Sequence, residues 1–205
     1  MFFRKIFIGM IVLLSYLESN ELYDSINLLP FDPHGWFFNS DQLVEICETS
    51  QPKTVIEVGS WLGASTRFIA ELIPAEGKLY AVDTWLGSDE QAHKKDPRLH
   101  RIYQIFLSNV VHAGLQNKII PVRMTSMEAA EALSVKADLI YIDASHKTQD
   151  VYNDIIAWSM HLNSEGVICG DDWAWSSVRI AVQKAAIELK QQIVAEDNFW
   201  RLKPL

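Results

Sequence analysis

The chain has 205 residues, of which 49% are hydrophobic and 21% charged, and this is an ordinary balance for one globular domain with a full core. The formal net charge of −8 counts against nucleic acid as the main partner, because phosphate binding needs a basic face. The two isolated cysteines, Cys47 and Cys169, count against a disulfide framework and against a cysteine zinc site.

The N-terminal segment, residues 1–19, differs in composition from the rest of the chain. Arg4 and Lys5 precede an apolar run over residues 6–17, in the charge order of a secretory signal but too short for a typical membrane span. The residues after the run are a poor cleavage site. Three interpretations stay open: a signal or membrane anchor, a helix that packs on a domain formed by residues 20–205, or a true start at Met10.

From residue 29 onward the pattern first shows a polar, proline-containing stretch and then alternating helices and strands. A helix begins at Ser40 or Asp41 and ends before Pro52. Further helices are expected at 64–73, 99–113, 126–133, 151–161 and 176–189, and strands at 55–58, 79–82, 119–123, 139–142, 167–170, 193–196 and 199–202. The polar residues 86–97 are long enough for a lid. This order predicts an α/β fold, with a doubly wound, mostly parallel sheet, helices on both faces and an antiparallel hairpin at one edge.

Three of the strand-like segments carry a carboxylate at or near their ends: Glu57, Asp83 and Asp143. In an open parallel sheet the carboxyl ends of the strands line the ligand crevice, so these three side chains are expected to approach one place. That arrangement suits a nucleoside with free ribose hydroxyl groups better than a ligand dominated by phosphate.

The turn after the first strand is rich in small residues, with Gly59, Gly63 and Ser65 following Glu57. Glycines permit a tight turn and a close approach of a ligand, and the next helix offers free amide groups. The spacing departs from the pyrophosphate pattern G-x-G-x-x-G, and Glu57 would repel a phosphate but accept a bond from an ammonium or hydroxyl group. The alternative is that the two glycines only make a tight turn.

On these residues the chain resembles class I S-adenosylmethionine-dependent methyltransferases, over roughly residues 36 to 205. It is most similar to the metal-dependent small-molecule O-methyltransferases of the catechol and macrolide-sugar types. The resemblance implies a Rossmann-like sheet of seven strands with the last strand antiparallel. It also implies the residues that contact the cofactor: Glu57, Gly59, Ser60, Gly63, Ser65, Asp83, Ser126, Met127 and Asp143.

A second group of polar residues follows the fourth and fifth strands: Asp143 with His146, and Asp171 with Asp172. Three carboxylates at one point need a cation, and their oxygens suit Mg²⁺, which would lower the pKa of a bound hydroxyl group. His146 is placed to take that proton. The resemblance implies the same ligands and base, although the catechol type has Lys for His146 and Asn for Asp172. Alternatively, the Asp pair caps the following helix and His146 is a solvated turn residue.

The predicted function is methyl transfer to a hydroxyl group of a small molecule, with no nucleic acid involved. Trp36, Trp61, Trp85, Trp173 and Trp175 fall near the expected rim, where they could stack an acceptor. A cofactor made in the cytoplasm favours a cytoplasmic location, while residues 1–19 leave export or weak membrane association open. Phe37 and Phe38 could serve a homo-oligomer contact. The competing hypotheses are a metal-independent methyltransferase, an NAD-linked oxidoreductase, and a non-catalytic exported or membrane-tethered binding domain.

Overall fold

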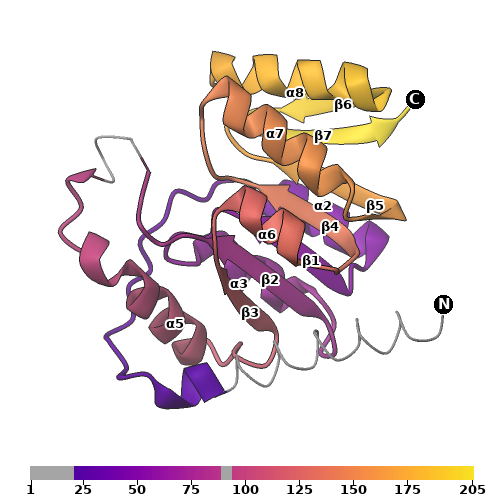
Figure 1. Ribbon diagram of the computed structural model, residues 1–205. Coiled ribbons are helices and arrows are strands. Elements are labelled where there is room, and N and C mark those ends of the chain that lie inside the picture. The colour runs from indigo at the N-terminus through magenta and orange to yellow at the C-terminus, as the bar shows by residue number, and fades with distance from the viewer. Residues whose placement is uncertain (1–20, 89–93) are drawn as a thin grey trace.

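The computed structural model describes residues 21–88 and 94–205, and these residues form a seven-stranded sheet in the order β3-β2-β1-β4-β5-β7-β6 (Figure 1). The strands are β1 Thr54–Val58, β2 Lys78–Asp83, β3 Ile119–Arg123, β4 Ala137–Ile142, β5 Leu162–Gly170, β6 Gln191–Glu196 and β7 Phe199–Pro204. Strands β1 to β5 are parallel, and β7 runs antiparallel to both β5 and β6. The predicted mostly parallel sheet with an antiparallel C-terminal hairpin is therefore confirmed.

Helices cover both faces of this sheet. They are α2 Ser40–Ser50, α3 Ala64–Leu72, α5 Ile102–His112, α6 Ser126–Ala132, α7 Thr148–Ser159 and α8 Ser176–Leu189, with a 3₁₀ turn η1 Leu99–Arg101 before α5. One apolar cluster joins α2, α3 and α5 to one face of the sheet, and a second joins α6, α7 and α8 to the other face. This is the doubly wound arrangement that the alternation of elements predicted.

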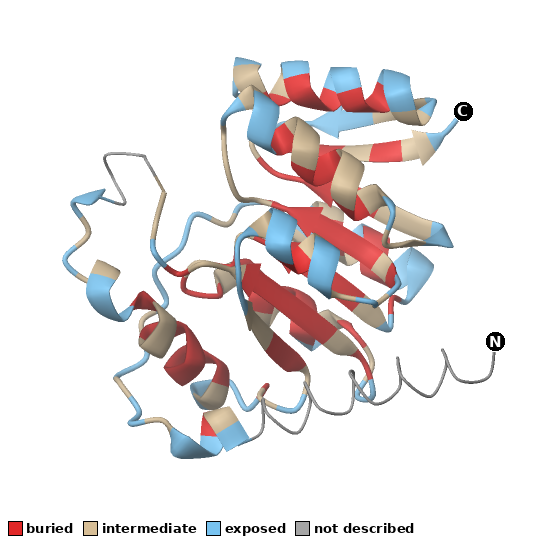
Figure 2. Ribbon diagram, in the orientation of Figure 1, coloured by how far each residue is buried: buried red, intermediate tan, exposed pale blue. Residues whose placement is uncertain are grey.

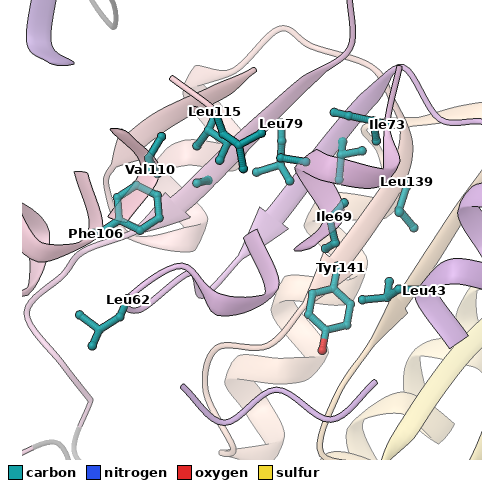
Figure 3. Packing of buried hydrophobic residues seen from close by; sticks show 14 of the residues in the cluster. Leu43, Leu62, Ile69, Ile73, Leu79, Phe106, Val110, Leu115, Leu139 and Tyr141 are labelled. Carbon is teal, nitrogen blue, oxygen red and sulfur yellow. The ribbon is translucent and has the colours of Figure 1, made fainter. Parts of the chain in front are cut away.

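The two clusters arise because neighbouring residues of a strand point to opposite faces. In β1, Val55 packs in the first cluster, while Ile56 and Val58 pack in the second. Apolar residues at both kinds of position bury both faces, and the central strands are the most deeply buried part of the fold (Figure 2). Figure 3 shows the first cluster, in which Leu79 and Leu139 of the sheet lie among side chains of the covering helices.

Element boundaries differ from the sequence predictions mainly at β5 and α7. Strand β5 begins at Leu162, five residues earlier than predicted, because Leu162 pairs with Ala137 before the register shifts and Val167 pairs with Leu139. The residues between are polar, so the sequence pattern indicated a loop. Helix α7 begins at Thr148, one turn ahead of its first buried apolar residue, Val151.

The predictions for residues 1–19 lie outside the described residues. Within residues 21–88 and 94–205, no helix is long and apolar enough to cross a membrane. Cys47 and Cys169 are both buried free thiols, as the sequence indicated.

Candidate active site

A cavity of about 530 Å³ lies at the carboxyl ends of the parallel strands, a volume within the usual range for small-molecule sites. Of the residues predicted to form the site, those that line it are Gly59, Ser60, Ser65, Asp83, Ser126, Asp143, His146, Asp171 and Asp172. Glu57, Gly63 and Met127 do not line it. The chain thus brings most of the predicted cofactor and acid–base residues to one place, as the crevice rule for parallel sheets requires.

The glycine turn is tight because it passes directly against the end of β4. Gly59 has φ +93°, and a Cβ atom there would lie 1.9 Å from the carbonyl oxygen of Asp143. Gly63 has φ +81° and is the N-cap residue of α3, and a Cβ atom there would lie 3.0 Å from the ring of Phe106. Both glycines are therefore required by conformation and by space, and the turn is pressed against the strand that carries Asp143.

Glu57 lies beneath this turn and is fully buried. Its carboxylate accepts hydrogen bonds from the hydroxyl groups of Ser60 (2.7 Å), Ser65 (2.6 Å) and Thr66. Burial raises the pKa of Glu57, and the three hydroxyl groups act in the opposite direction. In this arrangement Glu57 fixes the turn and the first turn of α3; its direct contact with a cofactor stays a prediction.

Asp83, at the end of β2, holds the same turn from the neighbouring strand. Its Oδ2 accepts from the backbone amides of Ser60 (3.0 Å) and Trp61 (2.8 Å), and its Oδ1 accepts from the amide of Trp85 (2.7 Å). The carboxylate also lines the cavity, and its contact with a ribose stays a prediction.

Ser126 begins α6 and lines the cavity, but its hydroxyl group points into the core. The hydroxyl donates to Asp154 Oδ1 and accepts from the indole of Trp158 (2.8 Å). The predicted contact of Ser126 with adenine would therefore use its backbone. Met124 lines the cavity and Met127 does not, although the two side chains are equally exposed.

Asp154 is nearly fully buried below this contact, and burial raises its pKa to about 6. Because the pKa of Asp154 is higher in the folded protein than in the unfolded chain, ionisation of this carboxyl group lowers the free energy of unfolding. This loss grows as the pH rises from about 4 to about 6 and is complete above that. We expect Asp154→Asn to raise the free energy of unfolding by about 1–3 kcal/mol at pH 8 and to leave it nearly unchanged at pH 4.5. Urea unfolding at both pH values checks this, with the exposed Asp24→Asn as control. An equal loss of stability at both pH values would contradict it.

Asp143, Asp171 and Asp172 meet at the cavity from the ends of β4 and β5. Burial, followed by the charges of Asp171 and Asp172, raises the pKa of Asp143 well above its usual range, and burial also raises the pKa of Asp171. Asp171 Oδ1 accepts from the amide of Asp172 (2.6 Å) and from the side chain of Asn198 (2.6 Å).

The three carboxylates do not form a metal-binding group as they are arranged. In the part of the chain that the structure describes, no cluster of three or more His, Cys, Asp and Glu side chains is set to hold a metal ion. Asp171 and Asp172 are also not helix caps, because α8 begins after Trp175 and lacks a side-chain cap. Instead, Asp171 Oδ1 accepts hydrogen bonds from the amide of Asp172 and from Asn198, and Asp172 Oδ2 pairs with His146.

His146 is paired with Asp172 and is not a solvated turn residue. Its Nε2 lies 2.6 Å from Asp172 Oδ2, and its ring lies 4.6 Å from the ring of Trp175 at an angle of 32°. Asp172 has φ +66°, the left-handed region, so its backbone adopts an uncommon conformation at the end of the fifth strand. A histidine oriented by a carboxylate beside a cavity is a suitable general base.

Two asparagines at the site were missed by sequence reasoning. Asn198, in the β6–β7 turn, lines the cavity and bonds the carboxylate of Asp171. Asn39, just before α2, is buried outside the cavity lining, where it hydrogen-bonds the carboxylate of Asp171 and donates to the hydroxyl of Tyr141 (3.2 Å). Both lie far in sequence from the motifs, and a single polar residue in a turn gives no signal by itself.

The tryptophans divide between cavity and core. Trp36, Trp61 and Trp175 line the cavity, as predicted. Trp85 is buried in the core between Tyr103 and Phe106, and Trp173 packs at the edge of the second cluster. Neither Trp85 nor Trp173 is part of the cavity wall.

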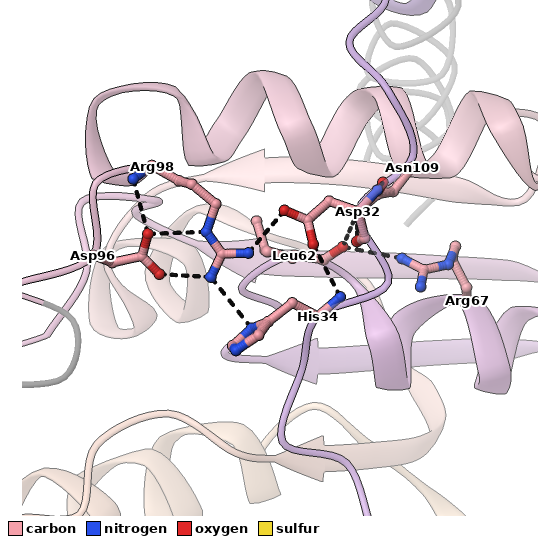
Figure 4. Close-up of polar contacts among 7 residues, drawn as sticks. All are labelled: Asp32, His34, Leu62, Arg67, Asp96, Arg98 and Asn109. Carbon is pink, nitrogen blue, oxygen red and sulfur yellow. Dashed lines mark hydrogen bonds and ion pairs between the residues drawn. The ribbon is translucent and has the colours of Figure 1, made fainter.

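The segment before α2, residues 26–39, carries one wall of the cavity and is tied to the segment before α5 by Arg98 (Figure 4). The Arg98 guanidinium lies 2.8 Å from Asp32 Oδ2 and 2.6 Å from Asp96 Oδ2. These contacts hold the pKa of Asp96 at about 2. Asn109 of α5 also bonds both the amide and the carbonyl of Asp32.

We expect Arg98→Gln to lower the free energy of unfolding by about 1–2 kcal/mol at neutral pH, because two carboxylates would then face each other without the guanidinium. Asp32→Asn should cost less, since the pair between Arg98 and Asp96 remains. Thermal unfolding checks both variants. A smaller loss for Arg98→Gln than for Asp32→Asn would contradict the assignment.

Comparison with known proteins places the chain in a family. The sequence profile described as "Methyltransferase domain" matches residues 56–173, more than half of the chain. No protein with a curated description matches.

Solved structures share the fold at low identity. A candidate O-methyltransferase from Klebsiella pneumoniae has a TM-score of 0.67 and 18% identity over 91% of this chain and 86% of its own. TomG from Streptomyces achromogenes, an O-methyltransferase solved with S-adenosylmethionine, has a TM-score of 0.63 and 14% identity, over 93% of this chain and 88% of its own. An O-methyltransferase from Bacillus cereus, solved with S-adenosylhomocysteine (SAH), has a TM-score of 0.62 and 14% identity, over 92% of this chain and 89% of its own. The chain therefore belongs to the methyltransferase domain family and has the fold of class I S-adenosylmethionine-dependent methyltransferases.

Proposed function

We propose that this chain transfers the methyl group of S-adenosylmethionine to a hydroxyl group of a small molecule, with His146 as the base. The observation that carries the proposal is the 2.6 Å pair between His146 and Asp172 in the same cavity as the glycine turn and Asp83. Methyltransferases act by aligning a sulfonium methyl group with a nucleophile, and a base beside the cofactor site completes that requirement.

The cofactor is assigned to the part of the cavity formed by Gly59, Asp83 and Ser126. The two similar proteins solved with S-adenosylmethionine or SAH align with this chain over nine-tenths of its length, which supports a cofactor of the same kind. Asp83 accepts from amides of the turn and its carboxylate lines the cavity. We assign the ribose hydroxyl groups to this carboxylate, because an acid at the end of the second strand is where a nucleoside ribose is bound in open parallel sheets.

Proton removal is assigned to the imidazole of His146. With Nε2 donating to Asp172, the nitrogen that takes a proton is Nδ1, and because this atom is buried, the ring must turn toward the acceptor before it can do so. As the acceptor oxygen attacks the methyl carbon, the carbon–sulfur bond breaks and its electron pair stays on sulfur. The hydroxyl proton passes to His146 Nδ1, and Asp172 stabilises the imidazolium.

A metal-assisted form of the same reaction, with Mg²⁺ held by Asp143, Asp171 and Asp172, is the second candidate. Its support is the raised pKa of Asp143 and of Asp171, because a divalent cation would relieve the repulsion between these carboxylates. Against it stand the hydrogen bonds of Asp171 and the pairing of Asp172 with His146. These residues do not fit a metal without rearrangement, and the reaction above is written without one.

Calorimetry of S-adenosylmethionine and SAH binding, with and without Mg²⁺, tests the proposal. We expect dissociation constants on the order of micromolar for wild type, and a loss of about tenfold or more for Asp83→Asn. The exposed Glu165→Gln is the matched control and should bind as wild type does. A folded protein that binds neither ligand would overturn the function. A separate Mg²⁺ heat that Asp143→Ala abolishes, with activity lost after chelation, would instead favour the metal-assisted form.

A further inference from the structure

Helix α6 is joined to helix α7 at one serine, and this serine also lines the cavity. The hydroxyl group of Ser126 donates to Asp154 Oδ1 and accepts from Trp158 Nε1 at 2.8 Å. Asp154 and Trp158 lie four positions apart in α7, so both are on the same side of that helix. The two helices lie next to each other on one face of the sheet (Figure 1). Helix α7 therefore holds the first residue of α6 through two hydrogen bonds.

The segment that begins α6 is exposed except at this serine. Within residues 124–128, which lead from β3 into α6, Ser126 is the one residue that is not exposed. Thr125 and Glu128 bond each other in a capping box, which closes the first helical turn. Those bonds are local and do not fix the turn against the rest of the fold. The position of this segment relative to the sheet therefore depends largely on the contacts of Ser126.

The same segment forms part of the cavity wall. Met124 and Ser126 both line the cavity, and Ser126 belongs to the part assigned above to the cofactor, where its predicted contact is with adenine. A ligand that binds a wall already held in place loses less free energy in ordering that wall. Contacts that fix Ser126 should therefore raise the affinity for the cofactor without touching it.

Asp154 is an unfavourable side chain for its depth in the fold. It is only 4% exposed, and burial raises the pKa of its carboxyl group. The charge of Asp150, one turn earlier in α7, acts in the same direction. An amide or an apolar side chain would destabilise the fold less at this depth. The carboxyl group supplies an acceptor for the hydroxyl of Ser126, whose oxygen is then free to accept from the indole of Trp158.

We propose that Asp154 and Trp158 are positioning residues of the cofactor site, which hold Ser126 and through it the wall that the adenine base of the cofactor contacts. This inference rests on the proposed function and adds two residues to its cofactor site. Neither Asp154 nor Trp158 lines the cavity, so both act through Ser126.

Calorimetry of SAH binding to a set of variants tests this role. Asp154→Ala and Ser126→Ala each remove the hydrogen bond from α6 to the carboxyl group, and we expect either to weaken SAH binding by about tenfold. Trp158→Phe removes only the indole donor and should weaken it by about threefold. Asp154→Asn keeps an oxygen that accepts from the serine, so it should bind SAH within about threefold of wild type. Ile155→Val changes the packing of a buried neighbour in α7 and is the matched control, which should bind as wild type does.

A second ligand locates the effect along the cofactor. 5′-Methylthioadenosine carries the adenosine part of SAH without the amino acid, and Asp154→Ala should weaken its binding by the same factor as that of SAH. The positioning role is overturned if Asp154→Ala and Ser126→Ala bind SAH as tightly as Ile155→Val does, or if Asp154→Asn loses as much affinity as Asp154→Ala. A loss that appears with SAH and not with methylthioadenosine would also overturn it, because the effect would then lie at the amino-acid end. If wild type itself fails to bind SAH, it is the proposed function that fails.

Discussion

Replacing His146 with alanine is expected to lower kcat by about 10²–10⁴ while the dissociation constant of SAH changes by less than about threefold. Among the described residues, His146 is the one imidazole that lines the cavity. Its Nε2 lies 2.6 Å from Asp172 Oδ2. Removing it deletes the group that takes the acceptor proton but leaves the glycine turn and Asp83 in place. Steady-state kinetics with an accepted hydroxyl compound, together with SAH calorimetry, checks both parts.

The carboxylate partner supplies the matched test of orientation. Asp172→Asn should lower kcat less than His146→Ala does, by about 10–10², because the imidazole stays but loses the charge that favours its protonated form. The double variant should be no worse than His146→Ala, since the two groups act as one unit. A His146→Ala enzyme with wild-type kcat would show that the acceptor loses its proton to another group.

The fold could be predicted because the information is local and repeated. Each strand of the central sheet is a short apolar run, each is followed by a helical pattern, and glycine or proline marks the breaks. Gly114, with φ +70°, ends the helical region where the sequence indicated it. The start of β5 was missed because the polar residues 163–166 separate the pair of Leu162 with Ala137 from the pair of Val167 with Leu139, and pairing between distant strands leaves no trace in the local pattern.

The site was predictable to the extent that it depends on strand ends. Asp83, Asp143 and Asp171 fall where apolar strands stop, so the topology brings them together. The direction of each carboxylate was not predictable, because it depends on neighbours in space. Glu57 faces three hydroxyl groups in the core, while Asp172 reaches His146 from another strand. The wall formed by residues 35–38 depends on an ion pair between Asp32 and Arg98, which lie 66 positions apart.

Replacing Gly59 with alanine should have the largest effect on stability of the changes considered. A Cβ atom at this position would lie 1.9 Å from the carbonyl oxygen of Asp143 and 2.7 Å from the Cα atom of Ala144, and both are backbone atoms that cannot turn aside. The backbone also has φ +93°, which costs an L-residue further free energy. We expect a loss of about 3 kcal/mol or more in the free energy of unfolding.

Gly114→Ala separates the free-energy cost of a positive φ angle from the cost of a steric clash at the Cβ atom. Gly114 has φ +70°, but nothing lies within 4 Å of a Cβ atom built on it, so its replacement should cost only about 1 kcal/mol. Urea unfolding and SAH calorimetry on the two variants give the comparison. Gly59→Ala should also abolish SAH binding, because the ends of β1 and β4 must separate and both line the cofactor cavity, whereas Gly114→Ala should bind as wild type does. Equal stability losses in the two variants would mean that the close approach of the turn to Asp143 does not hold the cavity together.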